Sequence, residues 1–248
     1  MILMLKHKKP KLGQCFLQDS GIAEQMVEYA GVSENDTVLE IGPGHGIITN
    51  EIQKTNCKII AVEKDKKLAK QIKKLFPDIT TIPKDILKIE IPPFNKIISN
   101  LPFEISSPVL AILSELDWQC AVLVLQKEFA ERFFYKAGEK KYSRLTVFMN
   151  YNFECEKLKG ISRNKFFPVP AVDTLIVRLT KRTPPFPTDK NFWDLVNALF
   201  RHKRKITRAA LKVESYSPEQ LAKLGPLGQL RVNNLTLNNL HDIWNALS

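Results

Sequence analysis

A strand, a glycine-rich turn and a helix follow one another directly in the first fifth of the chain, and this order most constrains the fold. Residues 37–41 are apolar enough for a buried strand, Gly42–Gly46 read Gly-Pro-Gly-His-Gly, and Ile47, Ile48 and Ile52 then recur at helical spacing. Glycines let the backbone approach a ligand closely, and a helix N-terminus directs N–H groups at it. The pattern therefore predicts the first βα unit of a doubly wound α/β fold, with a ligand at the carboxyl end of the strand.

Acidic side chains follow the next two predicted strands. Residues 58–62 end in Glu63, where a carboxylate can bind a ribose diol; the alternative, a helix N-cap, is a role that Asp65 could fill instead. Residues 79–82 are followed by Asp85, which could accept from an adenine amino group or merely begin a turn. The glycine spacing is GxGxG rather than the GxGxxG of dinucleotide-binding folds, which argues against a nicotinamide cofactor.

A stiff corner follows the fourth predicted strand, residues 96–99. Leu101 precedes a proline and is pushed towards an extended conformation, while Pro102 fixes its own φ and lacks an N–H. The Asn100 side-chain oxygen and the Leu101 carbonyl would then stand as acceptors beside the ring of Phe103. This arrangement suits an aromatic amine, whereas the alternative is a strand that ends in a proline turn with a core phenylalanine.

The composition favours a cytosolic protein with a polyanionic partner. The formal net charge is +11, and the hydrophobic fraction of 44% is ordinary for a globular chain. No apolar run approaches the roughly 20 residues of a membrane span, and the opening Met-Ile-Leu-Met-Leu is too short for a signal sequence. Cys15, Cys57, Cys120 and Cys155 are scattered, so we expect neither a disulfide framework nor a metal site.

Taken together, these motifs resemble the S-adenosylmethionine-dependent rRNA adenine dimethyltransferases, most closely over residues 8–180. The residues that carry the resemblance are Gly13-Gln14-Cys15-Phe16-Leu17, Glu40–Gly46, Glu63, Asp85, Asn100–Phe103, Ile105–Pro108, Tyr142–Leu145 and Phe166–Asp173. Within the family, the chain is similar to the universal small-subunit enzyme that dimethylates two adjacent adenosines near the 3′ end of 16S rRNA. Its compact form and its Gly-Gln-Cys-Phe-Leu sequence resemble archaeal members. Phe103, Ala171 and Thr174 stand where the family more often has Tyr, Lys and Ser, and none of these changes removes a necessary group.

The resemblance implies a seven-stranded, mostly parallel methyltransferase sheet, S-adenosylmethionine as cofactor, and a precursor of the small ribosomal subunit as partner of a monomeric enzyme. The implied catalytic residues are Asn100, Leu101, Pro102 and Phe103. The implied cofactor-binding residues are Gln14, Cys15, Leu17, Gly42, Gly44, Glu63, Asp85 and Asn100. Phe103 and Phe166 are expected at the target base, which must leave its stack to reach the pocket.

The proline-rich stretch 183–187 predicts a linker between two domains. We expect a methyltransferase domain with a basic N-terminal arm over residues 1–182, and a small all-α RNA-binding domain over residues 188–248. From Lys181 onward the chain carries 11 Lys and Arg against 5 Asp and Glu. Phosphate contacts are expected from a dense basic run, whose alternative role is a solvated face: Arg201, Lys203, Arg204, Lys205 and Arg208.

Two other functions remain open at this stage. One is methylation of 23S rRNA by a related resistance enzyme, which shares the pocket and differs in its C-terminal domain. The other is a non-catalytic RNA-binding role in ribosome assembly, which cofactor binding without methyl transfer would indicate.

Overall fold

The structure is a computed structural model that describes residues 15–247, so Gln14 and the basic N-terminal arm lie outside the described residues. The chain forms two compact units, which we treat separately. The sheet unit holds the residues up to Ala130 together with Cys155–Lys181, and the helical unit holds Glu131–Glu154 together with the residues from Arg182 onward.

The strands of the described residues are β1 (Phe16–Leu17), β2 (Thr37–Ile41), β3 (Lys58–Val62), β4 (Thr80–Ile82), β5 (Lys96–Asn100), β6 (Cys120–Gln126), β7 (Phe153–Ile161), β8 (Phe166–Phe167) and β9 (Thr174–Lys181). The α-helices are α1 (Ser20–Ala30), α2 (Ile47–Gln53), α3 (Lys66–Leu75), α4 (Ser106–Glu115), α5 (Lys127–Glu131), α6 (Arg144–Asn152), α7 (Lys190–Arg201), α8 (Thr207–Val213), α9 (Pro218–Ala222) and α10 (Leu237–Leu247). Among residues 15–247, none of these helices is long and apolar enough to cross a membrane.

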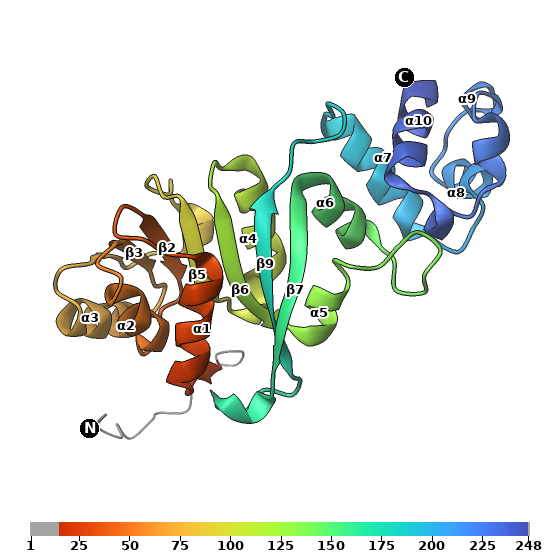
Figure 1. Ribbon diagram of the computed structural model, residues 1–248. Coiled ribbons are helices and arrows are strands. Elements are labelled where there is room, and N and C mark those ends of the chain that lie inside the picture. Colours follow the sequence, from red (N-terminus) through yellow and green to blue (C-terminus); the bar gives the residue numbers. More distant parts are fainter. Residues whose placement is uncertain (1–14, 248) are drawn as a thin grey trace. The chain divides into compact units, whose positions relative to one another are not determined.

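The main sheet confirms the predicted doubly wound, mostly parallel architecture (Figure 1). Its seven strands lie in the order β4-β3-β2-β5-β6-β9-β7, with β4 to β6 parallel and β9 antiparallel to β6. In the register of the sheet, Ile41 is opposite Val62 and Asn100 is opposite Val124. The carboxyl ends of β2, β3 and β5 therefore meet at one edge, which is where the sequence motifs lie.

Alternating side chains of the central strands bury both faces of this sheet. Val122 and Val124 belong to one core cluster with residues of α1, α2 and α3, whereas Leu123 and Leu125 are equally buried on the other face. The start of α1 is fixed by its N-cap Asp19, whose side chain accepts from the Ile22 N–H at 3.2 Å. Burial on both faces explains the continuous apolar run of β6.

A second, two-stranded sheet was not predicted from the sequence. β1 pairs antiparallel with β8, so that Phe16 is opposite Phe167 and Leu17 is opposite Phe166. The Gln18 N–H extends the pairing by donating to the Lys165 carbonyl at 2.8 Å. The segment that precedes α1 is thereby fixed against a loop about 150 residues later.

The helical unit begins earlier in the chain than the expected boundary near residue 188, because it includes residues 131–154. Val147 of α6 is buried in one core with Val196 and Leu199 of α7. Helix α5 ends at Glu131, and side chains of α6 bind the carbonyls that follow it: Thr146 donates to that of Arg132 and Asn150 to that of Phe133. Packing of α6 against α7 thus places residues 131–154 in the helical unit.

Candidate active site

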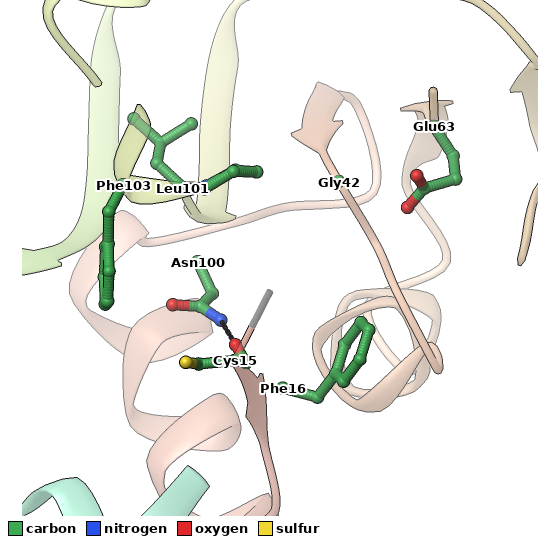
Figure 2. Close-up of a pocket in the computed structure, with 8 residues that line it drawn as sticks. Cys15, Phe16, Gly42, Glu63, Asn100, Leu101 and Phe103 are labelled. Carbon is green, nitrogen blue, oxygen red and sulfur yellow. Dashed lines mark hydrogen bonds between the residues drawn. The ribbon is translucent and has the colours of Figure 1, made fainter. Parts of the chain in front are cut away.

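A pocket opens at the carboxyl edge of the sheet (Figure 2). Residues from four sequence regions line it: Cys15, Phe16, Gly42, Glu63, Asn100, Leu101, Pro102 and Phe103. They come from β1 and the residue before it, from the loops after β2 and β3, and from the end of β5 with the corner that follows it. The structure therefore brings together the glycine loop, the first acid and the Asn-Leu-Pro-Phe corner, as the strand order predicts.

The Asn100 side chain is oriented by a single hydrogen bond. Its Nδ2 donates to the backbone carbonyl of Cys15 at 2.9 Å, and this bond is drawn in Figure 2. Its Oδ1 is buried and has no hydrogen-bond partner among the described residues. A buried acceptor without a partner is unfavourable by roughly 1–3 kcal/mol, so its presence indicates a ligand donor at this position.

The glycine loop adopts a backbone that other residues rarely accept. Gly42 has φ +68° and lies against the Pro102 ring, whose carbons are 3.5 Å from where a Cβ would stand. Gly44 has φ +57°, and its N–H donates to Glu63 Oε2 at 3.2 Å. Pro102 thus packs against the glycine loop, so the ends of β2 and β5 form one wall of the pocket.

Glu63 is buried at the end of β3 and remains an acceptor. Its Oε1 accepts from the Asp65 N–H at 2.9 Å, while Asp65 caps α3 through its own side chain. Burial raises the pKa of Glu63, whereas the N–H groups of Asp65 and Gly44 oppose that shift. The sequence left open whether Glu63 or Asp65 caps the following helix. In the structure Asp65 caps α3, and Glu63 lines the pocket.

The family assignment rests on two independent comparisons with known proteins. A family model described as ribosomal RNA adenine dimethylase matches residues 5–248. A probable ribosomal RNA small subunit methyltransferase A of Thermococcus kodakarensis is 42% identical over 212 residues, which cover 85% of this chain and 76% of that protein. The chain belongs to the ribosomal RNA adenine dimethylase family.

Two solved structures of related methyltransferases resemble this chain in both fold and sequence. A dimethyladenosine transferase from Plasmodium falciparum superposes with a TM-score of 0.82 at 27% identity, covering 92% of this chain and 95% of that one. The 23S rRNA methyltransferase ErmE superposes with a TM-score of 0.69 at 27% identity, covering 94% and 99%. The chain is thus an rRNA methyltransferase that depends on S-adenosylmethionine, as the sequence predicted.

The pocket of this dimethylase fits such a cofactor on its own geometry. Gly42 lines the pocket, Glu63 offers a carboxylate, and Asn100 holds an acceptor without a partner among the described residues. The predicted Gly44 does not line the pocket itself but lies against Phe16 and Glu63, which do. Those residues, together with the backbone of Cys15, could hold the cofactor. When bound, it supplies a methyl group carried on a sulfonium.

Asp85 lies outside the residues that line the pocket. Its Oδ1 accepts from the Leu87 N–H at 3.2 Å, and its Oδ2 pairs with Lys64 Nζ at 2.8 Å. The hydrogen bond from Lys64 keeps the pKa of Asp85 below its ordinary value. Asp85 therefore does begin a turn, and its proposed contact with the adenine amino group remains a prediction.

Two hydrophobic residues of the predicted site are buried. Leu17 is only 4% exposed and packs in the main core, and its contact with the cofactor stays a prediction. Phe166 is 2% exposed in the same core, whereas Phe167 is 44% exposed. Consecutive strand residues point to opposite faces, and the sequence does not say which of the two faces outwards. Phe166 is thus buried and Phe167 is the exposed aromatic of this pair, while the contact of Phe166 with the substrate stays a prediction.

The basic run lies in the helical unit and is not uniform. Arg201 pairs bidentately with Glu214, and His202 Nε2 is 2.7 Å from the same carboxylate. Lys203 Nζ donates to the carbonyl of Lys140 at 3.1 Å. Arg204 and Lys205 are exposed, and neither side chain has a hydrogen bond or ion pair of this kind among the described residues.

Arg208 occupies a special place in this unit. Its Nε is buried without a hydrogen-bond partner among the described residues. A Cβ on Gly228 would stand 3.2 Å from that Nε and 3.3 Å from Nη2, so the guanidinium lies directly over the glycine. The missing side chain of Gly228 is therefore what makes room for Arg208.

Sequence reasoning missed two residues of the site. Phe16 lines the pocket, and its place inside the Gly-Gln-Cys-Phe-Leu motif was the available signal. Glu40 is fully buried beneath the glycine loop, where its Oε2 accepts from Thr49 Oγ1 at 2.6 Å. Burial raises the pKa of Glu40 to about 8, helped by the neighbouring charge of Glu63 and opposed by Thr49.

Proposed function

We propose that this protein transfers methyl groups to N6 of two adjacent adenosines near the 3′ end of small-subunit rRNA, within a precursor of the small ribosomal subunit. The curated relatives from Thermococcus kodakarensis and Thermococcus sibiricus carry small-subunit names, which supports this substrate. The observation that carries the proposal is the Asn100 amide, whose Nδ2 is bound and whose Oδ1 is left as a buried acceptor.

The chemistry requires help at the adenine nitrogen, because the N6 lone pair is delocalised into the ring. Asn100 Oδ1 and the Leu101 carbonyl would each accept an N–H of that amino group. Both acceptors favour a more tetrahedral nitrogen and stabilise the positive charge that develops on it. No general base is needed before transfer, since the ammonium that forms is strongly acidic. The rate then depends on alignment of the reacting atoms.

The target base must leave its stack, which is unfavourable by a few kcal/mol. Phe103 is partly exposed where it lines the pocket, so its ring is placed to stack on the extruded base. Such stacking returns roughly 1–3 kcal/mol per base. Phe167 is a second exposed ring of the sheet unit, and we include it among the residues that meet RNA.

The helical unit is proposed to hold RNA phosphates through Arg204, Lys205 and Arg208. Arg204 and Lys205 are exposed, and Arg208 is partly exposed, with an Nε that has no hydrogen-bond partner among the described residues. We expect less from Arg201, because Glu214 already neutralises it, and less from Lys203, because it is bound to the Lys140 carbonyl. The predicted RNA contact of this run is thereby narrowed to three side chains.

The test is methylation of defined particles. The protein and radiolabelled S-adenosylmethionine are incubated with small and with large ribosomal subunits that lack the modifications, and the methylated nucleotides are mapped. We expect label on two adjacent adenosines of the small-subunit rRNA and none on the large subunit. Label on 23S rRNA instead would establish the activity of its structural relative ErmE.

Binding of both cofactor and small subunits without any transfer would establish the alternative role in ribosome assembly. The precursor particle as substrate, a monomeric state and a cytoplasmic location stay predictions of the same proposal.

A further inference from the structure

Phe16 lies directly on the glycine loop. If Gly44 carried a Cβ, that atom would stand 2.7 Å from Phe16 Cδ1 and 2.9 Å from Cε1. The neighbouring His45 ring is in contact as well, with ring centroids 4.4 Å apart and planes tilted by 51°. Figure 2 shows the Phe16 ring over this turn of the loop, on the Cys15 side of the pocket. The ring therefore occupies space that only a glycine at position 44 leaves open.

Gly44 is held from a second direction by Glu63. Its N–H donates to Glu63 Oε2 at 3.2 Å, and Glu63 is held in turn by the Asp65 N–H at 2.9 Å. The loop residue is thus fixed between an aromatic ring and the carboxylate that we assign to the cofactor. If Gly44 shifts because the Phe16 ring is lost, its hydrogen bond to Glu63 shifts with it.

The strand that carries Phe16 is itself anchored on both sides of that residue. The Cys15 carbonyl accepts from Asn100 Nδ2 at 2.9 Å. Leu17 is buried in the core and pairs with Phe166, and the Gln18 N–H donates to Lys165 at 2.8 Å. These contacts fix the backbone on both sides of Phe16, so the ring is presented to Gly44 from an anchored strand.

We propose that Phe16 is a positioning residue that fixes the glycine loop at Gly44 and His45, and through Gly44 fixes Glu63, in the arrangement that receives the cofactor. This inference rests on the proposed placement of the cofactor against Gly44 and Glu63. A loop fixed in advance loses less conformational freedom on binding, which increases affinity without any new contact. Phe16 therefore acts on cofactor affinity more than on the transfer step.

The first measurement is calorimetric binding of S-adenosylmethionine to Phe16→Ala and Phe16→Leu variants of the full chain. We expect the Kd to rise on the order of 10-fold for Ala, equivalent to about 1.4 kcal/mol, and by a smaller factor for Leu, which retains an apolar contact. The single-turnover rate at saturating cofactor should fall much less than the affinity. If Phe16→Ala does not fold, Phe16→Leu carries the test alone.

The matched control is Met26→Ala, which removes a fully buried side chain of α1 from the main core, where Leu17, the neighbour of Phe16, is also buried. Thermal unfolding is followed for all variants. We expect Met26→Ala to lose stability and keep the wild-type Kd. Equal increases in Kd for the Phe16 and Met26 variants would reduce Phe16 to an ordinary core residue and overturn the proposal.

The decisive measurement is a double-mutant cycle of Phe16→Ala with Glu63→Ala. If Phe16 acts through Gly44 and Glu63, its effect on Kd shrinks in the Glu63→Ala background, whereas independent effects add. Additive effects would refute the inference and leave the proposed function intact. Failure of the wild-type protein to methylate small subunits would refute the proposed function whatever the cycle gives.

Discussion

The Nδ2 atom of Asn100 lies 2.9 Å from the backbone carbonyl oxygen of Cys15, 85 residues earlier in the chain, and donates a hydrogen bond to it. This bond settles which way round the amide sits, because a carbonyl oxygen can only accept. Oδ1 is left buried and without a partner among the described residues, on the side where the base is proposed to enter. The motif before α1 therefore orients the acceptor at the end of β5.

Loss of the Asn100 acceptor should reduce the methylation rate and leave RNA binding nearly unchanged. For Asn100→Ala we expect single-turnover methylation of small subunits to fall on the order of 10²–10³-fold, as when one preorganised group is removed from an oxyanion hole. Interactions that strengthen in the transition state are seen in turnover and not in affinity. Thermal unfolding measured in parallel separates this result from lost stability. A stable variant that binds RNA and retains a near-normal rate would contradict the catalytic role.

Asn100→Asp should be no more active than Asn100→Ala, although aspartate also offers an acceptor. One carboxylate oxygen would face the Cys15 carbonyl in place of the Nδ2 donor, and two acceptors at 2.9 Å repel each other. The side chain would then turn away from the position that Oδ1 now holds. The same single-turnover assay checks this, with Asn238→Asp, an exposed residue of α10, as the control for added charge. Activity well above that of the Ala variant would show that the hydrogen bond to Cys15 is dispensable.

Glu40 should make the stability of the protein fall as pH rises. Burial raises its pKa from 4.5 to about 8, so the unfolded chain ionises first, and stability declines between those two values and levels off above them. Glu40→Gln cannot ionise, so it should gain several degrees in Tm relative to wild type between pH 5 and pH 8.5. Thermal unfolding across that range is the measurement, with the exposed Glu24→Gln as control. Parallel pH profiles for wild type and Glu40→Gln would exclude this assignment.

Only some residues of the basic run should contribute to the salt dependence of RNA binding. Each phosphate contact adds roughly 0.7–0.9 to the slope of log K against log salt. We expect the Arg204→Ala, Lys205→Ala double variant to flatten the slope of RNA binding by up to that amount per residue. Arg201→Ala, whose guanidinium is paired with Glu214, should leave the slope almost unchanged. If both variants changed the slope equally, the run would be a solvated charged face without distinct phosphate contacts.

Gly228→Ala should weaken RNA binding without any change of charge. The added methyl group would stand 3.2 Å from Arg208 Nε and 3.3 Å from Leu224 Cβ, so the guanidinium has to move. We expect an affinity loss of several-fold, close to that of Arg208→Ala. Gly160→Ala is the matched control, because nothing lies within 4 Å of its added Cβ. Wild-type affinity in Gly228→Ala would show that the position of Arg208 over the glycine is immaterial.

The sequence alone determined the α/β architecture and the edge of the sheet at which the site lies. Gly42–Gly46, Glu63 and Asn100–Phe103 each follow a predicted strand, and parallel strands bring their carboxyl ends to one edge. Strand periodicity and glycine punctuation are local properties, so they can be read from neighbouring residues. The cofactor and the rRNA substrate class came from the resemblance that these same motifs carry.

Only the tertiary structure decided which side chains act at that edge. It placed Phe16 on Gly44 and turned the Asn100 amide towards Cys15. It also buried Phe166 instead of Phe167 and moved residues 131–154 into the helical unit. Each of these outcomes depends on contacts between segments tens of residues apart or more, such as β1 against β8 and α6 against α7. Local patterns do not encode such pairings, because a contact between distant segments is selected by how well the whole core packs.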